Sequence, residues 1–476
     1  MPTRRVGLVV VLYVFICGVA PVANAGTTKL FGAEGAKQFP GSGSFASSDP
    51  LLNRIWAASV KTAQDMLVPG PLTVDASGRP CAIAVQTAII DGVVRDRCPY
   101  VGDEAVIDRT LDASTPDWDT QRSMLLWFAH AQHGDGAIPA SPIYGGSLVL
   151  FDYNAYWVQA LETYVLYSGD ATLAREVWPN LVRLIDVFYP ARARPDGLLV
   201  DDLGPSDYAY IRRPGTVVAY YNAQYVLALR QAAQLARWLG ETGAASRWST
   251  RADDVASACD AAFWDAGAGA YSDTTNDPAT HPQDGNAFAV LSGVATHQQA
   301  LSALAYLAGH DWRGYGNTIV DTDAWDGPAW GWQASERVYP FMSYFELVAR
   351  FELGLDSSAF DLIRREWGYM VENGPGTMWE TIGPYGGPPT DQHPSYDSGW
   401  SSGAAPALTQ YVLGVEPTSP GFATFTVTPH PNDLTWAEGD VPTPHGPIHV
   451  SWRRIGGAVF LRVKAPAGTV WTNGPR

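Results

Sequence analysis

The amino-acid sequence predicts a mainly helical protein built from antiparallel helix pairs, such as an α/α toroid, followed by a small antiparallel β unit. Three segments have the pattern of a helix, a Gly-containing turn and a second helix, with turns at Gly169, Gly240 and Gly354. This pattern is typical of αα-hairpins. From residue 422 onwards, the chain contains short runs in which apolar and polar residues alternate, and Pro and Gly separate these runs. This pattern is typical of strands.

The unequal lengths of the connections favour a closed ring of hairpins. The turns inside the hairpins are tight, whereas long loops rich in Gly, Pro, Asp and Trp separate the helix pairs, at residues 134–146, 195–214, 266–285, 315–334 and 374–398. Loops of this length in a compact domain are usually functional, so we expect the site on the loop face. An open helical solenoid is the alternative, but its repeats would resemble one another more closely.

The first residues predict export from the cell. Arg4 and Arg5 precede an apolar run and a small-residue pattern that ends at Ala25, which is typical of a secretory signal peptide in residues 1–25. No later stretch reaches about 18 apolar residues. We therefore expect a secreted protein that is cleaved after Ala25 and has no membrane partner. An uncleaved N-terminal anchor is the alternative.

The remaining chain divides into three parts. We expect an extended lead-in at residues 26–47, the helical domain at 48–415 and the β unit at 416–476. Asp49 and Pro50 are typical of a capped helix start, and this helix is expected to end near Pro69. The apolar run 82–90 predicts a short buried strand that leads into a charged loop.

Charge and cysteine content exclude several classes of protein. The formal net charge of −17 disfavours nucleic acid as a partner, because such partners require clustered Lys and Arg. Of the four cysteines, Cys17 lies in the signal peptide, and Cys81 and Cys98 are the natural disulfide pair because they flank the charged loop. Cys259 suits a buried apolar position. No zinc-binding spacing is present, so no metal or cofactor is expected, and the sequence leaves the oligomeric state open.

The charged loop at residues 91–103 is the first candidate site, with the sequence DGVVRDRCPYVGD. Hydrolysis of a glycosidic bond requires two carboxyl groups, one as acid and one as base or nucleophile, and Asp96 lies between Arg95 and Arg97. The arginines lower the pKa of Asp96, whereas burial and nearby carboxylates raise it, and the sequence leaves this balance open. A solvated turn with structural ion pairs is the alternative.

A second acid lies on the longest loop. The segment 374–380, GPGTMWE, presents Trp379 beside Glu380, a pairing that suits a sugar because the ring covers an apolar sugar face while the acid binds hydroxyl groups. A capped turn over the core is the alternative. Further along, His393 and Trp400 are candidates for substrate binding, although a lone histidine is more often structural.

Together these motifs resemble the α-L-rhamnosidase-like six-hairpin glycosidases, a family of inverting glycoside hydrolases. The resemblance covers the chain from about residue 44 onwards. It rests on the loop 91–103, on PGTMWE, on residues 399–422 and on the helix motifs FDYNAYW and YPFMSYFE. It implies an (α/α)6 toroid at residues 48–415 and a C-terminal β unit.

The resemblance also implies roles for individual residues. Asp96 would be the general acid and Glu380 the base that activates water. The expected substrate-binding residues are Asp91, Arg95, Tyr100, Asp103, Trp379, His393 and Trp400. Among these, Asp91 and Asp103 would bind sugar hydroxyls and Arg95 would position the acid.

We therefore expect a secreted, exo-acting inverting glycoside hydrolase that removes terminal α-L-rhamnose from a carbohydrate substrate. One alternative is an α/α-toroid polysaccharide lyase, which would need a positive cleft and a Tyr/His or Lys/Arg arrangement. Another is a non-catalytic sugar-binding protein that retains the pocket.

Overall fold

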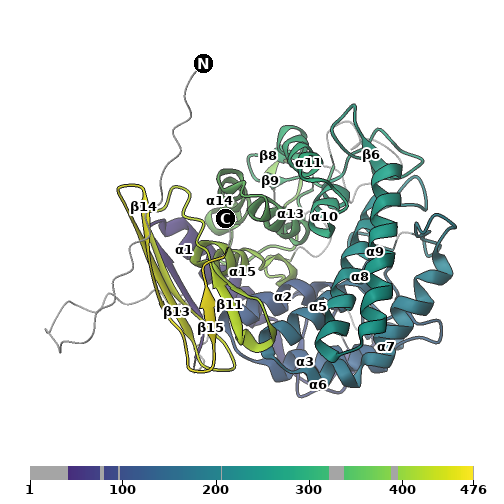
Figure 1. Ribbon diagram of the computed structural model, residues 1–476, viewed down its shortest axis with the longest axis horizontal. Helices are drawn as coiled ribbons and strands as arrows, with labels where there is room; N and C mark the ends of the chain where they lie inside the picture. Colours follow the sequence, from purple (N-terminus) through teal and green to yellow (C-terminus); the bar gives the residue numbers. More distant parts are fainter. Residues whose placement is uncertain are drawn as a thin grey trace, which may run out of the picture.

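The computed structural model describes residues 41–74, 80–94, 97–204, 206–320, 337–387 and 395–474. The expected signal peptide, most of the lead-in, and Arg95, Asp96 and His393 lie outside these ranges. The described chain is mainly helical and carries several small sheets, as Figure 1 shows.

Six helical segments follow the long loops and pack against one another in sequence order. They are α2 (Val101–Ser114), α5 (Tyr153–Ser168), α8 (Ala219–Leu239), α10 (Gln283–Ser292), α13 (Pro340–Glu352) and the short pair η4 (Gly399–Ser401) with α15 (Ala404–Ala407). Each helix packs on the next, and the η4–α15 pair packs on both α13 and α2. The contacts therefore run from the first helix to the last and return to the first.

A second set of helices pairs with the first. This set comprises α1 (Pro50–Asp65), α3 (Trp118–His130), α6 (Ala171–Glu176), α7 (Trp178–Arg183), η1 (Leu184–Phe188), α9 (Thr242–Phe263), α11 (His297–His310) and α14 (Asp356–Asn373). Helix α9 packs on α8, α11 on α10 and α14 on α13. The pairs that turn at Gly240 and Gly354 confirm two of the three predicted hairpins.

The hairpin turns need residues that tolerate a left-handed backbone. Gly169 and Gly240 have φ values of 74° and 82° and cap α5 and α8, which is the usual use of glycine after a helix. The third hairpin differs from the prediction in its second helix. Residues 171–188 form α6, α7 and η1 in place of one continuous second helix, and Pro179 near the start of α7 lacks the N–H that a continuous helix requires there.

The helix start at Asp49 is confirmed. The Asp49 carboxylate accepts a hydrogen bond from the Leu51 backbone N–H at 2.8 Å, as expected for an N-cap. Helix α1 ends at Asp65, and strand β2 (Leu67–Pro69) occupies the positions where the helix was expected to end.

The apolar run 82–90 forms parts of two strands instead of one. Strand β4 (Pro80–Ile83) pairs with β3 (Leu72–Val74), whereas β5 (Thr87–Ile89) pairs with β2. Apolar character alone predicts burial but does not specify the partner strand, and here two different partners divide the run.

The C-terminal residues form two sheets beside the helices. Strands β12 (Trp436–Val441), β13 (Ile448–Ile455) and β14 (Ala458–Lys464) are antiparallel, and β1 (Ser44–Ser47) adds an edge strand on β12. A second sheet contains β10 (Val415–Pro417), β11 (Thr424–Val427) and β15 (Val470–Thr472). Residues 44–47, expected in the lead-in, therefore belong to the same sheet as the end of the chain.

This β unit packs on the helices through buried side chains. Trp452 of β13 donates a hydrogen bond from Nε1 to the Val412 carbonyl oxygen at 2.8 Å. Figure 1 shows the strands gathered on one side of the molecule, beside α1 and α15.

Aromatic side chains fill the space that the six loop-following segments surround. Tyr156 of α5 contacts Phe341 and Phe345 of α13, with ring centroids 5.2 and 5.5 Å apart, and Phe288 of α10 at 6.1 Å. All four rings are buried. Helices distant in the sequence are thus joined through one aromatic core.

Candidate functional site

Three segments that the sequence separates by up to about three hundred residues are joined by main-chain hydrogen bonds. The Gly399 N–H donates to the Asp91 carbonyl oxygen at 2.8 Å, and the Val93 N–H donates to that of Asp397 at 3.3 Å. The Ser398 N–H donates to the Met378 carbonyl oxygen at 3.0 Å. The beginning of the charged loop, the segment before Glu380 and the segment before Trp400 therefore lie side by side.

Asp91 is held within this arrangement by its side chain. Its carboxylate is only 7% exposed and accepts a hydrogen bond from the Ser398 hydroxyl at 3.0 Å. The hydrogen bond fixes the orientation of this buried carboxylate. The Asp91 side chain therefore needs no ordering before it binds a ligand.

Asp103 and Tyr100 lie at the start of α2. The Asp103 carboxylate is 2% exposed and accepts a hydrogen bond from the Tyr153 hydroxyl at 2.9 Å, and the Tyr100 ring meets the Tyr153 ring edge-on at 6.5 Å. Gly102 permits this contact, because a Cβ atom there would lie 2.5 Å from the Tyr153 ring. Burial, followed by the charge of Asp103, raises the pKa of Tyr153, which therefore stays a hydrogen-bond donor.

Glu380 is 4% exposed, and its backbone is held at two points. Its N–H donates to the Ser395 carbonyl oxygen at 3.0 Å, and its carbonyl oxygen accepts a hydrogen bond from Trp400 Nε1 at 2.8 Å. Trp400 in turn stacks on Phe341, with ring centroids 5.1 Å apart. The candidate base is therefore tied to helix α13 through the indole ring of Trp400.

The Trp379 side chain packs against different residues from those that contact Trp400. Its buried ring meets the rings of Tyr369 and Tyr396 edge-on, at 6.1 and 5.2 Å, and its backbone N–H donates to the Met370 sulfur at 3.2 Å. Tyr369 and Met370 belong to α14, so this tryptophan packs against the second set of helices. Its expected part in substrate binding stays a prediction.

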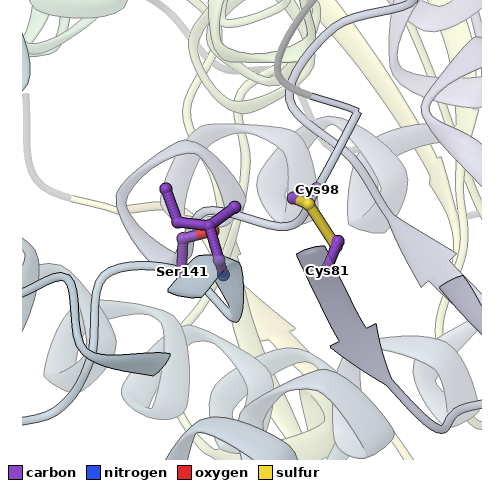
Figure 2. The surroundings of a disulfide bond; sticks show 4 residues. Cys81, Cys98 and Ser141 are labelled. Atoms are coloured by element: carbon purple, nitrogen blue, oxygen red, sulfur yellow. A yellow bond between two sulfur atoms is a disulfide. The ribbon is translucent and has the colours of Figure 1, made fainter. Parts of the chain in front are cut away.

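The loop that contains Asp96 is fastened on both sides of that residue. Cys81 of β4 forms a disulfide with Cys98, as Figure 2 shows, which confirms the predicted pair. The Cα atoms of the two cysteines lie 5.9 Å apart. Arg97 donates a hydrogen bond to the Val93 carbonyl oxygen at 2.7 Å. Arg95, Asp96 and His393 lie outside the described residues, and their assigned roles stay predictions.

A buried cluster of charged side chains at the loop ends of the helices was not predicted from the sequence. Arg213 forms ion pairs with Asp207, Asp273 and Asp284 at 3.2, 2.5 and 2.5 Å. All four side chains are almost completely buried. The sequence indicated the long loops 195–214 and 266–285 as functional segments, but it does not show which of their acids form ion pairs with Arg213.

The cluster connects to the neighbourhood of Glu380. The Tyr208 hydroxyl donates to Asp284 at 3.4 Å, and the Tyr208 ring meets that of Tyr339 edge-on at 5.6 Å. Tyr339 also meets Trp400 edge-on, at 6.2 Å. A continuous set of packed side chains therefore links the cluster to the tryptophan that holds Glu380.

Acids around the site have perturbed ionisation. Burial and the neighbouring Asp65 raise the pKa of Asp397 to about 7, with Lys61 acting in the opposite direction. Burial also raises the pKa of Asp273 to about 7, although Arg213 opposes the shift. Perturbed acids of this kind are common at functional sites.

The described residues show neither a metal centre nor a membrane span. No group of three or more His, Cys, Asp or Glu side chains among them is arranged to hold a metal ion. None of their helices combines the length and the apolar character that crossing a bilayer requires.

The described fold consists of paired helices with acids and aromatics at their loop ends, and comparison with known families specifies the class of protein. Residues 82–317 match the bacterial α-L-rhamnosidase six-hairpin glycosidase domain, and residues 414–472 match the bacterial α-L-rhamnosidase C-terminal domain. The two matches together cover more than half of the chain. The protein belongs to the bacterial α-L-rhamnosidase family of six-hairpin glycosidases.

Individual relatives share only part of their length with this chain. An α-L-rhamnosidase of Alteromonas sp. (strain LOR) is 29% identical over a match covering 24% of this chain and 13% of the relative. An α-L-rhamnosidase of Streptomyces avermitilis is 28% identical over 22% and 11%. The chain therefore matches only 13% and 11% of the length of these two curated relatives.

Solved structures match over most of the chain. A GH78 family rhamnosidase from Bacillus sp. GL1 has a TM-score of 0.73 and 25% identity, covering 92% of this chain and 43% of its own. A rhamnosidase from Klebsiella oxytoca with rhamnose bound has a TM-score of 0.62 and 24% identity, covering 78% and 65%. The second likeness concerns the fold alone.

Proposed function

We propose that this protein is a secreted, exo-acting α-L-rhamnosidase that hydrolyses terminal rhamnose with inversion of configuration. The observation that carries the proposal is the main-chain joining of residues 91–93, 378 and 397–399. Neighbouring extended segments lie roughly 5 Å apart, so the loop of Asp96 starts within roughly 10 Å of the segment that leads to Glu380. This spacing suits two carboxyl groups that act on one bond.

In the proposed reaction, Asp96 donates a proton to the glycosidic oxygen while Glu380 removes a proton from water. The activated water attacks the anomeric carbon from the opposite face, and the bond to the leaving group breaks. An inverting enzyme of this kind needs carboxyl groups about 6.5–9.5 Å apart, which leaves room for the water. Arg95 positions the acid.

The buried carboxylates would orient the sugar. The hydroxyl groups of Ser398 and Tyr153 already hold the carboxylates of Asp91 and Asp103 in place. These carboxylates can therefore accept further hydrogen bonds from the sugar without losing side-chain entropy on binding. Tyr100, Trp379, His393 and Trp400 are the further proposed substrate-binding residues.

We also propose that the helices form an (α/α)6 toroid with the site at one end. Support comes from the circuit of contacts among α2, α5, α8, α10, α13 and the η4–α15 pair. Each member of this circuit starts beside a long loop, so one end of the circuit collects the loop residues.

Export with removal of residues 1–25 is proposed on two grounds. The N-terminal sequence has the pattern of a signal peptide, and the Cys81–Cys98 disulfide suits an oxidising compartment. Mass spectrometry of the mature protein from the culture medium should give a chain that begins at Gly26. A chain that keeps Met1 and stays in the cell would contradict export.

The decisive test is incubation of the mature protein with aryl α-L-rhamnoside while the product is followed by proton NMR. The proposal predicts free rhamnose whose first-formed anomer is inverted relative to the substrate. Retention of configuration would contradict the inverting mechanism and the role of Glu380 as a base, an unsaturated product would indicate a lyase, and binding without any cleavage would indicate a sugar-binding protein.

A further inference from the structure

A cavity of about 510 Å³ lies at the opposite end of the helix circuit from the candidate site. Its polar lining includes Arg109, Gln159, Glu162, Gln231, Glu352 and Glu416. These residues lie in the middle or C-terminal parts of their helices or just beyond them. Asp103, Tyr153 and Asp284, by contrast, lie in the first turn of α2, α5 and α10. The cavity therefore opens on the other end of the helices.

The aromatic core separates the cavity from the candidate site. Phe345 lines the cavity and packs on Phe341 at 5.5 Å, and Phe341 stacks on Trp400 at 5.1 Å. Tyr156 and Phe288 complete this layer of buried rings. A molecule in the cavity would thus be distinct from one bound beside Glu380.

Two amide side chains in the cavity have polar atoms that no described residue satisfies. Gln159 is 1% exposed, and its Nε2 has no hydrogen-bond acceptor among the described residues. The Oε1 atom of Gln231 has no hydrogen-bond donor among them. A buried polar group without a partner is energetically costly, because it has lost its hydrogen bonds to water. Such groups indicate that a ligand or water completes their hydrogen bonds.

The charged groups in the cavity are of both signs. Arg109 donates a hydrogen bond to the Ala105 carbonyl oxygen of its own helix at 2.6 Å. Glu162 lies near enough for Arg109 to counteract the effect of burial, which raises the pKa of Glu162 to about 7. Glu352 and Glu416 lie on the exposed side of the cavity.

This lining discriminates among classes of ligand. An anion would meet Glu162, Glu352 and Glu416, and a compact cation would meet Arg109 and the Gln159 amide group. An apolar ligand would leave the amides unsatisfied. A neutral polyhydroxylated molecule has donors for the carboxylates and for Gln231, acceptors for Gln159 and Arg109, and C–H faces for the Tyr344 and Leu227 walls. The volume lies within the range of about 300–1,000 Å³ that is usual for small-molecule sites.

We propose that this cavity is a second binding site for a neutral saccharide of one or two units. The Gln159 and Gln231 amide groups, whose unsatisfied atoms are covered in this structure, turn towards the cavity and bind sugar hydroxyls, and Arg109 and Glu162 bind a neighbouring pair of hydroxyls. The inference stands on the cavity and its unsatisfied groups, independently of whether the loop-end site hydrolyses rhamnosides.

Crystals of the full chain soaked separately in L-rhamnose and D-glucose test the site directly. We expect a sugar in the cavity within hydrogen-bond distance of Gln159 and Gln231. A sugar found only beside Glu380, or in neither place, would overturn the proposal. Preferential binding of inorganic phosphate or spermidine in the cavity would overturn the assigned class of ligand.

A matched pair of variants tests the amide in solution by calorimetric titration with the same sugars. Gln159→Leu should weaken binding at this site about tenfold, since it removes one hydrogen bond and its directing group. Gln224→Leu is the control, because Gln224 is equally buried with an unsatisfied Nε2 but does not line the cavity. Equal effects of the two substitutions on binding would contradict the site.

A second pair tests the volume. Val348→Trp places an indole in the cavity and should abolish binding, whereas Val187→Trp places one on an exposed position of η1 and should leave binding unchanged. Unchanged binding in a folded Val348→Trp variant would contradict the proposal. If that variant fails to fold, the result for Gln159→Leu decides.

Discussion

Trp400 donates a hydrogen bond from its indole Nε1 to the main-chain carbonyl oxygen of Glu380 at 2.8 Å. The indole ring stacks on Phe341 of α13, which lies in the aromatic core. The backbone that carries the candidate base is thereby anchored to a rigid helix, so that in the proposed reaction Trp400 would act through Glu380.

Trp400→Phe should lower kcat about tenfold while changing KM less, because the ring is kept but the donor that holds Glu380 is lost. Steady-state kinetics on an aryl α-L-rhamnoside measure both constants. Trp471→Phe in β15 is the control and should leave both unchanged. If kcat is unaffected in Trp400→Phe, the hydrogen bond does not position the base.

Asp96→Asn and Glu380→Gln should each lower hydrolysis by about 10²–10⁴-fold, which is the usual contribution of a general acid or base. The two can be told apart with substrates of different leaving groups. A dinitrophenyl rhamnoside needs no protonation of its leaving group, so it should restore much of the activity of Asp96→Asn but not that of Glu380→Gln.

The controls for this pair are Asp254→Asn and Glu372→Gln, which carry the same chemical changes on exposed helix positions. Both should retain full activity. Full hydrolysis by Asp96→Asn or by Glu380→Gln would refute the catalytic assignment. A crystal structure with these two carboxyl groups well beyond about 9.5 Å apart, without a loop movement that closes the gap, would also contradict inversion.

Replacing Cys81 and Cys98 by Ser should lower the free energy of unfolding by about 2–4 kcal/mol, because the disulfide closes a chain segment with a separation of 17 residues. Activity should fall as well, since Cys98 holds the loop that contains Asp96. Urea denaturation with and without reductant measures the effect.

The buried free thiol provides the comparison. Cys259→Ala removes a cysteine that forms no disulfide, so this variant should remain sensitive to reductant, whereas the double Ser variant should be insensitive. Equal stability of the wild-type protein in reduced and oxidised buffer would show that the disulfide is not formed in solution.

Asp112→Asn should stabilise the protein above about pH 5, and the gain should grow with pH towards about pH 7. Burial raises the pKa of Asp112 to about 7, compared with about 3.9 for an unfolded Asp. The folded state therefore holds a proton that the unfolded state releases, so this contribution to stability is complete below about pH 4 and is lost as the pH rises through about 7.

Asparagine keeps the oxygen that accepts the hydrogen bonds at this position. One carboxylate oxygen of Asp112 accepts hydrogen bonds from Trp118 Nε1 at 2.8 Å and Gln121 Nε2 at 3.1 Å, and the other has no partner among the described residues. Urea denaturation at about pH 5 and about pH 8 should show a gain on the order of a few kcal/mol at the higher pH. The exposed Asp254→Asn should show none, and an unchanged pH dependence in Asp112→Asn would contradict the shift.

Arg213→Met should destabilise the fold by about 3–5 kcal/mol, because it leaves Asp207, Asp273 and Asp284 buried without their counter-charge. Arg212→Met, the adjacent but exposed arginine, should change stability by less than about 0.5 kcal/mol. Chemical denaturation measures both. Similar effects of the two substitutions would show that the cluster does not support the fold.

The sequence by itself determined the local features whose physical causes lie within a few residues. Asp49 caps α1 because a carboxylate can reach the next free N–H groups, and Gly240 ends α8 because glycine readily adopts positive φ. The helix pairs, the strands of the tail and the proximity of Cys81 to Cys98 followed from the same short-range reasoning. The motif at 91–103 contributed to the resemblance to the family, and the family match confirmed that resemblance.

Only the tertiary structure decided which distant groups meet. Hydrogen bonds between residues 91–93 and 397–399, the link from Trp400 to Glu380, and the three acids around Arg213 all join positions far apart in the chain. The division of the apolar run 82–90 into two strands depends on two separate partners. Such contacts arise from the packing of whole helices and loops, so neither residue type nor periodicity along the chain specifies them.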